Sequence, residues 1–308
     1  MMEAQVKALS KEIKSTFIRY RHKLLLDKGV IIQLYKAVLT ESYYLSSIKW
    51  AVFRKRSRIR YQFRLKVPVP GYPNYIIGLN FEQDEEFLLL ALGNFLKNLF
   101  LEQSVYSDYS LAYTRADEAS ALKTYVRIIR GFGRVKCLLF FDFSASMLRI
   151  SVNRLLTKLK PFLHPYIYNL TQSYLELPVI NERTGADIRW DMKVENGLEG
   201  FPPVGSEAAN VLFNFYLDEL DKSVQKAFPG LEYVRYKSGV VIPIYSESDI
   251  CNSEFDLDQF TNLYEELNLA CSTRTVCAGG KAVEFVGGLL FVDLLGYVNV
   301  IEVTESEP

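Results

Sequence analysis

Residues 232–243 read Glu-Tyr-Val-Arg-Tyr-Lys-Ser-Gly-Val-Val-Ile-Pro. Two short runs rich in Tyr, Val and Ile, residue types that favour extended backbone, flank the dipeptide Ser238-Gly239. Small residues of this kind suit the tight turn of a β-hairpin. The stretch therefore predicts two antiparallel strands joined at Ser238 and Gly239, and this hairpin is expected at the centre of the fold.

Apolar patterns on both sides of the hairpin predict a mixed fold of helices and strands. Residues 135–143 form a continuous apolar run, which is typical of a strand at the centre of a sheet. Residues 175–196 and the segment that ends at Val303 are expected to form short strands and turns. Helical spacing predicts helices over 4–27, 30–47, 82–103, 117–130, 207–227 and 257–269, and a helix over 149–174 that Pro161 and Pro165 interrupt.

Residues 49–66 form a strongly basic segment. Towards its end, residues 58–67 alternate apolar side chains with polar ones, all basic except Gln62, as a two-faced strand does. The segment contains eight basic residues and no acidic one: Lys49, Arg54, Lys55, Arg56, Arg58, Arg60, Arg64 and Lys66. A row of cations at strand spacing can follow the phosphates of a nucleic acid, so the cations from Arg54 to Lys66 are candidate RNA contacts. The alternative is a solvated edge strand whose charge prevents aggregation.

Composition limits where such a site can arise. The chain has 308 residues, of which 49% are hydrophobic and 23% charged, enough for a sizeable core. Its formal net charge is zero. A nucleic-acid site must therefore come from local clustering of charge.

Cysteine spacing and hydropathy argue against a zinc site and a membrane span. The four cysteines include no Cys-x-x-Cys pair and only two histidines are present, which favours reduced thiols in an intracellular compartment. The most apolar run, residues 285–301, is shorter than the ~20 residues of a membrane helix and predicts buried strands. No signal-peptide core is found near the N-terminus. No membrane partner is expected, and an organelle matrix and a bacterial cytoplasm both fit.

Several blocks, in order along the chain, resemble reverse transcriptases of the group II intron maturase type. Residues 109–115 are similar to a fingers segment, and residues 138–143 (Leu-Leu-Phe-Phe-Asp-Phe) to the first palm strand with its aspartate, Asp142. Residues 200–206 resemble the Pro-Gln-Gly-Ser block through Pro203, Gly205 and Ser206. Residues 235–239 are similar to the Arg-Tyr-Ala-Asp-Asp hairpin, with Tyr236 in the place of its tyrosine. Residues 267–269, 274–275 and 285–287 resemble the closing blocks.

The resemblance implies an α+β fold of the polymerase right-hand type. An antiparallel palm sheet would be backed by helices, and the thumb would be absent or reduced. N-terminal helices and a fingers-like region would occupy residues 1–134, and a palm-like reverse-transcriptase domain residues 135–308. Because no Ser/Gly-rich linker separates these parts, one articulated unit is expected.

The resemblance also implies a polymerase site that has lost most of its negative charge. Such polymerases use two divalent cations, which require oxygen ligands, and the family holds them with three aspartates. Ser238 and Gly239 occupy the positions of two of these aspartates, and Lys237 adds a positive charge. Asp142 is therefore expected to be vestigial, as an ion-pair partner of Lys237, and Mg²⁺ is expected as a cofactor only if some activity remains.

Other carboxylates are not expected to replace the lost ones. Glu247 and Asp249 lie eight or more residues beyond Gly239, about 25 Å along an extended strand. Asp191, Asp218 and Asp221 are interpreted as surface residues of a helix or turn.

Three functions are compatible with this interpretation. The first is a reverse-transcriptase-like protein that has lost RNA-directed DNA polymerase activity and binds RNA as a maturase-like or ribonucleoprotein factor. The second is a structural subunit of a larger ribonucleoprotein or polymerase complex, and the third is an active unconventional reverse transcriptase. RNA is the expected partner, together with other proteins of such a ribonucleoprotein.

Overall fold

The computed structural model describes residues 2–20, 27–45, 49–54, 65–68, 75–80, 82–106, 110, 118–177, 206–245, 255–285 and 288–302. The chain divides into two compact units that interleave along the sequence. Unit 1 combines Met1–Leu99 with Ala145–Phe213, and unit 2 combines Phe100–Ser144 with Asn214–Pro308. The domain boundary predicted between residues 134 and 135 rests on the resemblance of sequence blocks. The division into compact units does not test it, so it stays a prediction.

Unit 1 contains helices and a three-stranded antiparallel sheet of order β1-β3-β2. The strands are β1 (Lys49–Arg54), β2 (Leu65–Pro68) and β3 (Tyr75–Asn80). The helices are α1 (Met2–Tyr20), α2 (Lys28–Leu39), most of α3 (Gln83–Glu102), α5 (Val152–Leu159) after the short 3₁₀ helix η1 (Ser144–Leu148), α6 (Pro165–Leu175) and the first turns of α8 (Glu207–Ala227).

The interrupted helix predicted over 149–174 is confirmed as α5 and α6. His164 caps α6 and Pro165 takes its first position, where a missing backbone N–H costs nothing. The predictions of a helix over 82–103 and of another over 207–227 are confirmed as α3 and α8. Of the strand predicted over 58–67, the structure describes residues 65–67, which lie in β2. Residues 178–200 lie outside the described part of the chain.

Gly93 lets α3 and the start of α8 approach closely within unit 1. A Cβ atom on residue 93 would lie 2.6 Å from the Ala208 backbone N and 2.7 Å from the Glu207 carbonyl C. We expect Gly93→Ala to lower the free energy of unfolding by about 1–3 kcal/mol, because overpacking outweighs the better helix propensity of alanine. Urea denaturation measures this, with Asn98→Ala at an exposed position of the same helix as the control. A Gly93→Ala variant as stable as wild type would show that α8 can shift away from residue 93 without a loss of stability.

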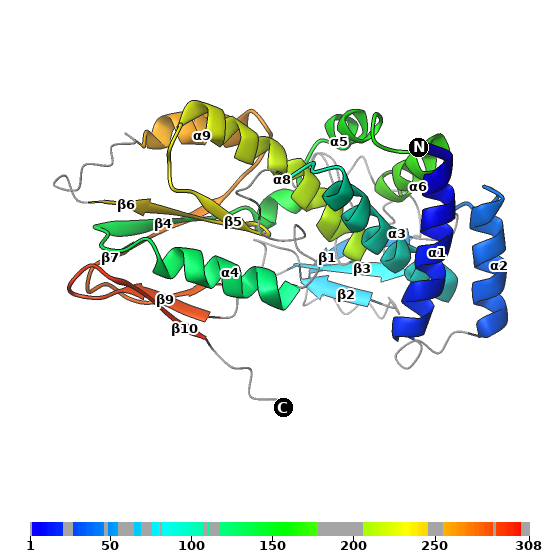
Figure 1. Ribbon diagram of the computed structural model, residues 1–308, viewed down its shortest axis with the longest axis horizontal. Coiled ribbons are helices and arrows are strands. Elements are labelled where there is room, and N and C mark those ends of the chain that lie inside the picture. Colours follow the sequence, from blue (N-terminus) through cyan, green and yellow to red (C-terminus); the bar gives the residue numbers. More distant parts are fainter. Residues whose placement is uncertain are drawn as a thin grey trace. The chain divides into compact units, whose positions relative to one another are not determined.

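Unit 2 is built on a four-stranded antiparallel sheet of order β5-β6-β4-β7 (Figure 1). Its strands are β4 (Cys137–Asp142), β5 (Val234–Tyr236), β6 (Gly239–Ile244) and β7 (Ser272–Cys277). β4 lies between β6 and β7, which confirms the predicted central strand.

The predicted hairpin is confirmed as β5 and β6, but its turn is shifted by one residue. Lys237 and Ser238 form the turn, whereas Gly239 pairs with Tyr236 and with Asp142. Lys237 adopts φ +54°, in the left-handed region that favours glycine. Pairing with β4 therefore extends the sheet to Gly239, and a lysine takes the conformation that the sequence assigned to the glycine.

Both faces of the unit 2 sheet are covered. Figure 1 shows α8 and α9 (Leu257–Glu265) along one face and α4 (Glu118–Arg130) along the other. The α4 face also packs against a second antiparallel sheet of order β10-β9-β8, made of β8 (Val283–Phe285), β9 (Gly288–Val292) and β10 (Val298–Glu302).

The alternation of β4 side chains explains the continuous apolar run. Leu138 and Phe140 belong to the core shared with α4 and the second sheet. Phe141 points to the other face, where its ring centroid lies 4.6 Å from that of Phe260 in α9. Because β4 is covered on both faces, its sequence does not alternate between apolar and polar side chains.

The protein is thus a mixed α+β structure with an antiparallel sheet, as expected. Among the helices that the structure describes, none combines the length and the apolar character needed to cross a bilayer.

Candidate functional site

The end of the unit 2 sheet brings the predicted site residues into one row. The strand register places Asp142 opposite Gly239 on one side and opposite Ser272 on the other, and it pairs Gly239 with Tyr236. Directly opposed residues of neighbouring strands share a face of the sheet. The structure therefore brings Asp142 beside the Lys237–Ser238 turn, the juxtaposition that the palm resemblance implies.

A pocket of about 310 Å³ opens at this row. Arg274, one row further along β7, lies opposite Phe140 and joins the lining. Of the described residues that line the pocket, only Asp142 carries a carboxylate, whereas Lys237 and Arg274 are cationic. The lining residues are Phe140, Phe141, Asp142, Tyr236, Lys237, Ser238, Gly239, Ser272, Arg274 and Val283. Two positive charges and one negative charge leave this lining with a net positive charge.

The Asp142 carboxylate is held by amide and hydroxyl donors. Its Oδ1 accepts hydrogen bonds from the Ser144 backbone N–H at 2.8 Å and from Ser238 Oγ at 3.2 Å. Its Oδ2 accepts one from Ser144 Oγ at 3.0 Å. Ser238, which the resemblance places at the position of an aspartate, thus donates to Asp142. Lys237 Nζ lies 5.6 Å from the Tyr236 ring centroid, and its pairing with Asp142 stays a prediction.

The donors at this pocket do not match a two-metal centre. Magnesium binds through oxygen ligands and is usually held by more than one carboxylate or by substrate phosphates as well. Within the part of the chain that the structure describes, no group of three or more His, Cys, Asp or Glu side chains is placed to hold a metal ion. Glu247 and Asp249 lie outside the described residues.

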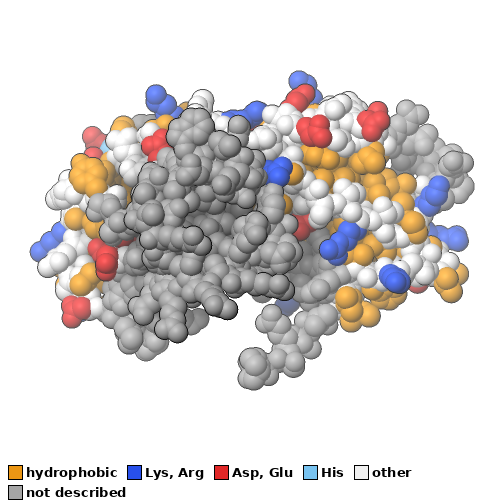
Figure 2. All heavy atoms as spheres, turned by 180° about the vertical axis from the view of Figure 1, so that it is seen from behind, with side chains coloured by type: hydrophobic (Ala, Val, Ile, Leu, Met, Phe, Trp, Pro, Cys, Tyr) orange, Lys and Arg blue, Asp and Glu red, His pale blue; other side chains and the backbone are white. Residues whose placement is uncertain are grey.

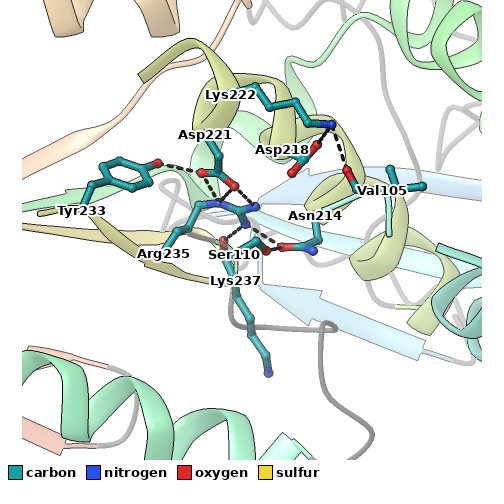
Figure 3. Close-up of polar contacts among 9 residues, drawn as sticks. All are labelled: Val105, Ser110, Asn214, Asp218, Asp221, Lys222, Tyr233, Arg235 and Lys237. Carbon is teal, nitrogen blue, oxygen red and sulfur yellow. Dashed lines mark hydrogen bonds and ion pairs between the residues drawn. The ribbon is translucent and has the colours of Figure 1, made fainter. Parts of the chain in front are cut away.

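A buried polar network, centred on Arg235, lies on the opposite face of the hairpin (Figure 3). The Arg235 side chain is fully buried, and its Nε and Nη2 donate to the two Asp221 oxygens at 2.8 Å and 2.6 Å. Its Nη1 donates to Asn214 Oδ1 at 2.6 Å and to the Lys237 carbonyl oxygen at 2.7 Å. Burial would lower the pKa of Arg235, but the Asp221 charge and hydrogen bonds raise it overall. The guanidinium therefore stays charged and holds the turn that carries Lys237.

Further residues complete the network around α8 (Figure 3). Tyr233 Oη donates to Asp221 Oδ1 at 2.8 Å. Asp218 pairs with Lys222 at 2.6 Å, and Lys222 Nζ donates to the Val105 carbonyl oxygen at 2.8 Å.

The prediction that Asp218 and Asp221 are surface residues is wrong, because both are 0% exposed. The error follows from assuming that charges on a helix face solvent, whereas α8 is buried on nearly all sides from Ala208 to Asp221. The sequence contained a signal of this burial. It places two acidic residues three positions apart in an apolar helix and an arginine in an apolar strand. Charged side chains in such apolar elements require partners when they are buried.

The basic segment and the Pro-Gln-Gly-Ser-like block belong to unit 1 and are only partly described. Arg54 ends β1 and Lys66 lies in β2, two strands that both pair with β3. Ser206 precedes α8, and its Oγ accepts a hydrogen bond from the Ala209 N–H at 3.1 Å, as a helix cap does. Lys55, Arg56, Arg58, Arg60, Arg64, Pro203 and Gly205 lie outside the described residues.

Comparison of the chain with protein-family models and with curated protein sequences finds no match. The relation to reverse transcriptases therefore stays a prediction that rests on the sequence blocks. The geometry of the pocket and of the buried network does not depend on it.

Proposed function

We propose that this protein is a reverse-transcriptase-like RNA-binding factor without metal-dependent polymerase activity, and that the unit 2 pocket contacts the RNA backbone. The observation that carries the proposal is the charge of the pocket lining, where Lys237 and Arg274 outnumber Asp142. A polymerase centre needs the opposite balance, because it must attract divalent cations.

The Lys237 and Arg274 side chains are suited to bind phosphate groups. Arg274 is exposed, and it has no ion-pair partner among the residues that the structure describes. A guanidinium of this kind can donate two parallel hydrogen bonds to a phosphate. Lys237 is also exposed and projects from a turn that the buried Arg235 holds in place.

The remaining polar groups favour RNA over other polyanions. The Asp142 carboxylate beside two cations is an acceptor for a ribose 2′-hydroxyl, the group that distinguishes RNA from DNA. The juxtaposition of Asp142 and the hairpin turn also agrees with the palm that the sequence blocks imply.

Local clustering matters because the chain is neutral overall. On the face drawn in Figure 2, Lys, Arg, Asp and Glu side chains of the described residues are interspersed with hydrophobic ones. The basic segment from Arg54 to Lys66, which belongs to unit 1, is proposed as a second RNA contact.

The test is RNA binding by fluorescence anisotropy across a salt series, with the variant Lys237→Ala/Arg274→Ala. We expect affinity to fall at least tenfold, and the salt slope to fall by about 1.4, because each lost phosphate contact on a single strand removes about 0.7. The control, Lys136→Ala/Lys226→Ala, removes the same charge away from the pocket and should bind as wild type. The variant Arg58→Ala/Arg60→Ala/Arg64→Ala tests the basic segment separately.

Other results would point to other functions. Unchanged affinity in the pocket variant, or binding that EDTA abolishes, would contradict the proposed pocket. Nucleotide incorporation that Asp142→Ala abolishes would establish an active unconventional enzyme.

One observation favours a structural subunit as the second candidate. Leu294, Leu295 and Tyr297, between β9 and β10, are 87%, 64% and 51% exposed. Neighbouring exposed apolar side chains often mark a protein contact. A protein complex purified from the native source without RNA would favour this candidate.

A further inference from the structure

Two cysteines of unit 2 stand opposite one another on neighbouring strands. Cys137 begins β4 and Cys277 ends β7, and the strand register pairs the two residues directly. Opposed residues of antiparallel strands have Cα atoms about 4.5–5.5 Å apart. Disulfides span Cα distances of roughly 4.4–6.8 Å. We propose that Cys137 and Cys277 are a thiol oxidation site and form a reversible disulfide that ties β7 to β4.

The orientation of the two side chains supports this pairing. Both thiols are free in the structure, and the strand register places the Cys137 and Cys277 side chains on the same face of the sheet. The two thiols therefore lie on the same side of neighbouring strands, and bond formation requires no change of register.

Competing partners are remote within the described part of the chain. Cys271 lies six residues before Cys277, about 20 Å along an extended strand. Cys251 is outside the described residues, so the experiment has to address it directly.

The chemistry needs a disulfide oxidant, for which oxidised glutathione is the reagent. Cys277 is exposed, whereas Cys137 is partly buried and burial raises the pKa of its thiol. The Cys277 thiolate attacks one sulfur of oxidised glutathione, forms a mixed disulfide and releases one glutathione thiolate. The Cys137 thiolate then attacks the Cys277 sulfur and releases the second glutathione. In total two thiols lose two electrons and two protons, and one oxidised glutathione becomes two reduced molecules.

The location gives the disulfide a structural effect. β7 pairs with β4 and lies at the edge of the four-stranded sheet, and most of its side chains are exposed. Edge strands open more readily than central ones, so a covalent link at one end should hold the strand on the sheet. β7 also carries Ser272 and Arg274, so the link constrains the strand that supplies part of the pocket lining.

The test uses the full reduced chain, equilibrated with glutathione at increasing ratios of oxidised to reduced form. We expect loss of two thiols per chain, a peptide in which Cys137 is linked to Cys277 under non-reducing digestion, and full reversal by dithiothreitol. Hydrogen exchange should slow at β7 amides, and the Tm should rise by several degrees.

Variants separate this pair from the other cysteines. Cys277→Ser and Cys137→Ser should each abolish the link, whereas Cys251→Ser/Cys271→Ser should leave it unchanged. Glutathione retained on Cys277 without a Cys137 link, or a linked peptide that contains Cys251 or Cys271, would overturn the proposal. Oxidation of the wild-type chain without slower exchange at β7 would overturn the structural effect.

Discussion

Replacing Asp221 with alanine is expected to destabilise unit 2 by about 3–5 kcal/mol, because the Arg235 guanidinium would stay buried without its counter-charge. Both side chains are 0% exposed, and two parallel hydrogen bonds join them. Tyr233 Oη would also lose its acceptor. Chemical denaturation of the full chain, followed by far-UV circular dichroism, measures the change.

Three comparison variants distinguish a buried charge from lost packing. Asp221→Asn keeps the shape and one acceptor oxygen, so it should destabilise less than alanine does. Arg235→Met/Asp221→Leu removes both charges, and replacement of a buried pair by apolar residues is often neutral or stabilising. Glu265→Ala, at an exposed position of α9, should stay within about 0.5 kcal/mol of wild type. An Asp221→Ala variant within about 1 kcal/mol of wild type would mean that water reaches Arg235.

The buried pair has a consequence for the pocket on the other face of the hairpin. Arg235 Nη1 binds the carbonyl oxygen of Lys237, a residue with a left-handed backbone. Such a conformation in a non-glycine residue costs energy and persists where its surroundings hold it. The position of Lys237 therefore depends on Asp221, although the two side chains lie on different sides of the strand.

Local patterns predicted the elements of unit 2 well. The apolar run before Asp142, the hairpin at residues 232–243 and the helix α8 all follow from residue types within a few positions of one another. The position of the turn did not follow, because the local preference for glycine is weaker than the register that pairs Gly239 with Asp142.

Charges with distant partners were the hardest to predict. Arg235 and Asp221 are 14 residues apart and come from a strand and a helix, so no periodicity links them. β1 was also not predicted, because its partner β3 lies more than 20 residues further along the chain and the intervening basic residues dominated the pattern. In both cases the structure depends on contacts between residues that are far apart in the sequence.

Introducing aspartates at residues 238 and 239 of the hairpin is expected to create a divalent-cation site. In Ser238→Asp/Gly239→Asp, residue 239 would lie in the same row as Asp142, where an added side chain shares its face of the sheet. Gly239 lies in β6 and is not among the described glycines with positive φ, so its backbone accepts an aspartate. Three neighbouring carboxylates raise one another's pKa and repel, and a divalent cation relieves that repulsion.

The expected result is therefore opposite with and without metal. In EDTA the double aspartate variant should be less stable than wild type by about 1–2 kcal/mol, and Mn²⁺ at 100 times its Kd should restore about 2.7 kcal/mol. Metal-free RNA affinity should fall, because the pocket lining changes from net positive to net negative. Thermal unfolding with and without Mn²⁺, and Mn²⁺ titration by electron paramagnetic resonance, give independent readouts.

The matched control is Ser238→Asn/Gly239→Asn, which has nearly the same shape and no added charge. It should bind Mn²⁺ no better than wild type, whereas the aspartate variant should bind at least tenfold more tightly. Equal Mn²⁺ affinity in the two variants would mean that the hairpin does not hold residues 238 and 239 close enough to Asp142 to share an ion. Tight binding only in the aspartate variant would show that the hairpin and Asp142 can share a divalent cation once residues 238 and 239 carry carboxylates.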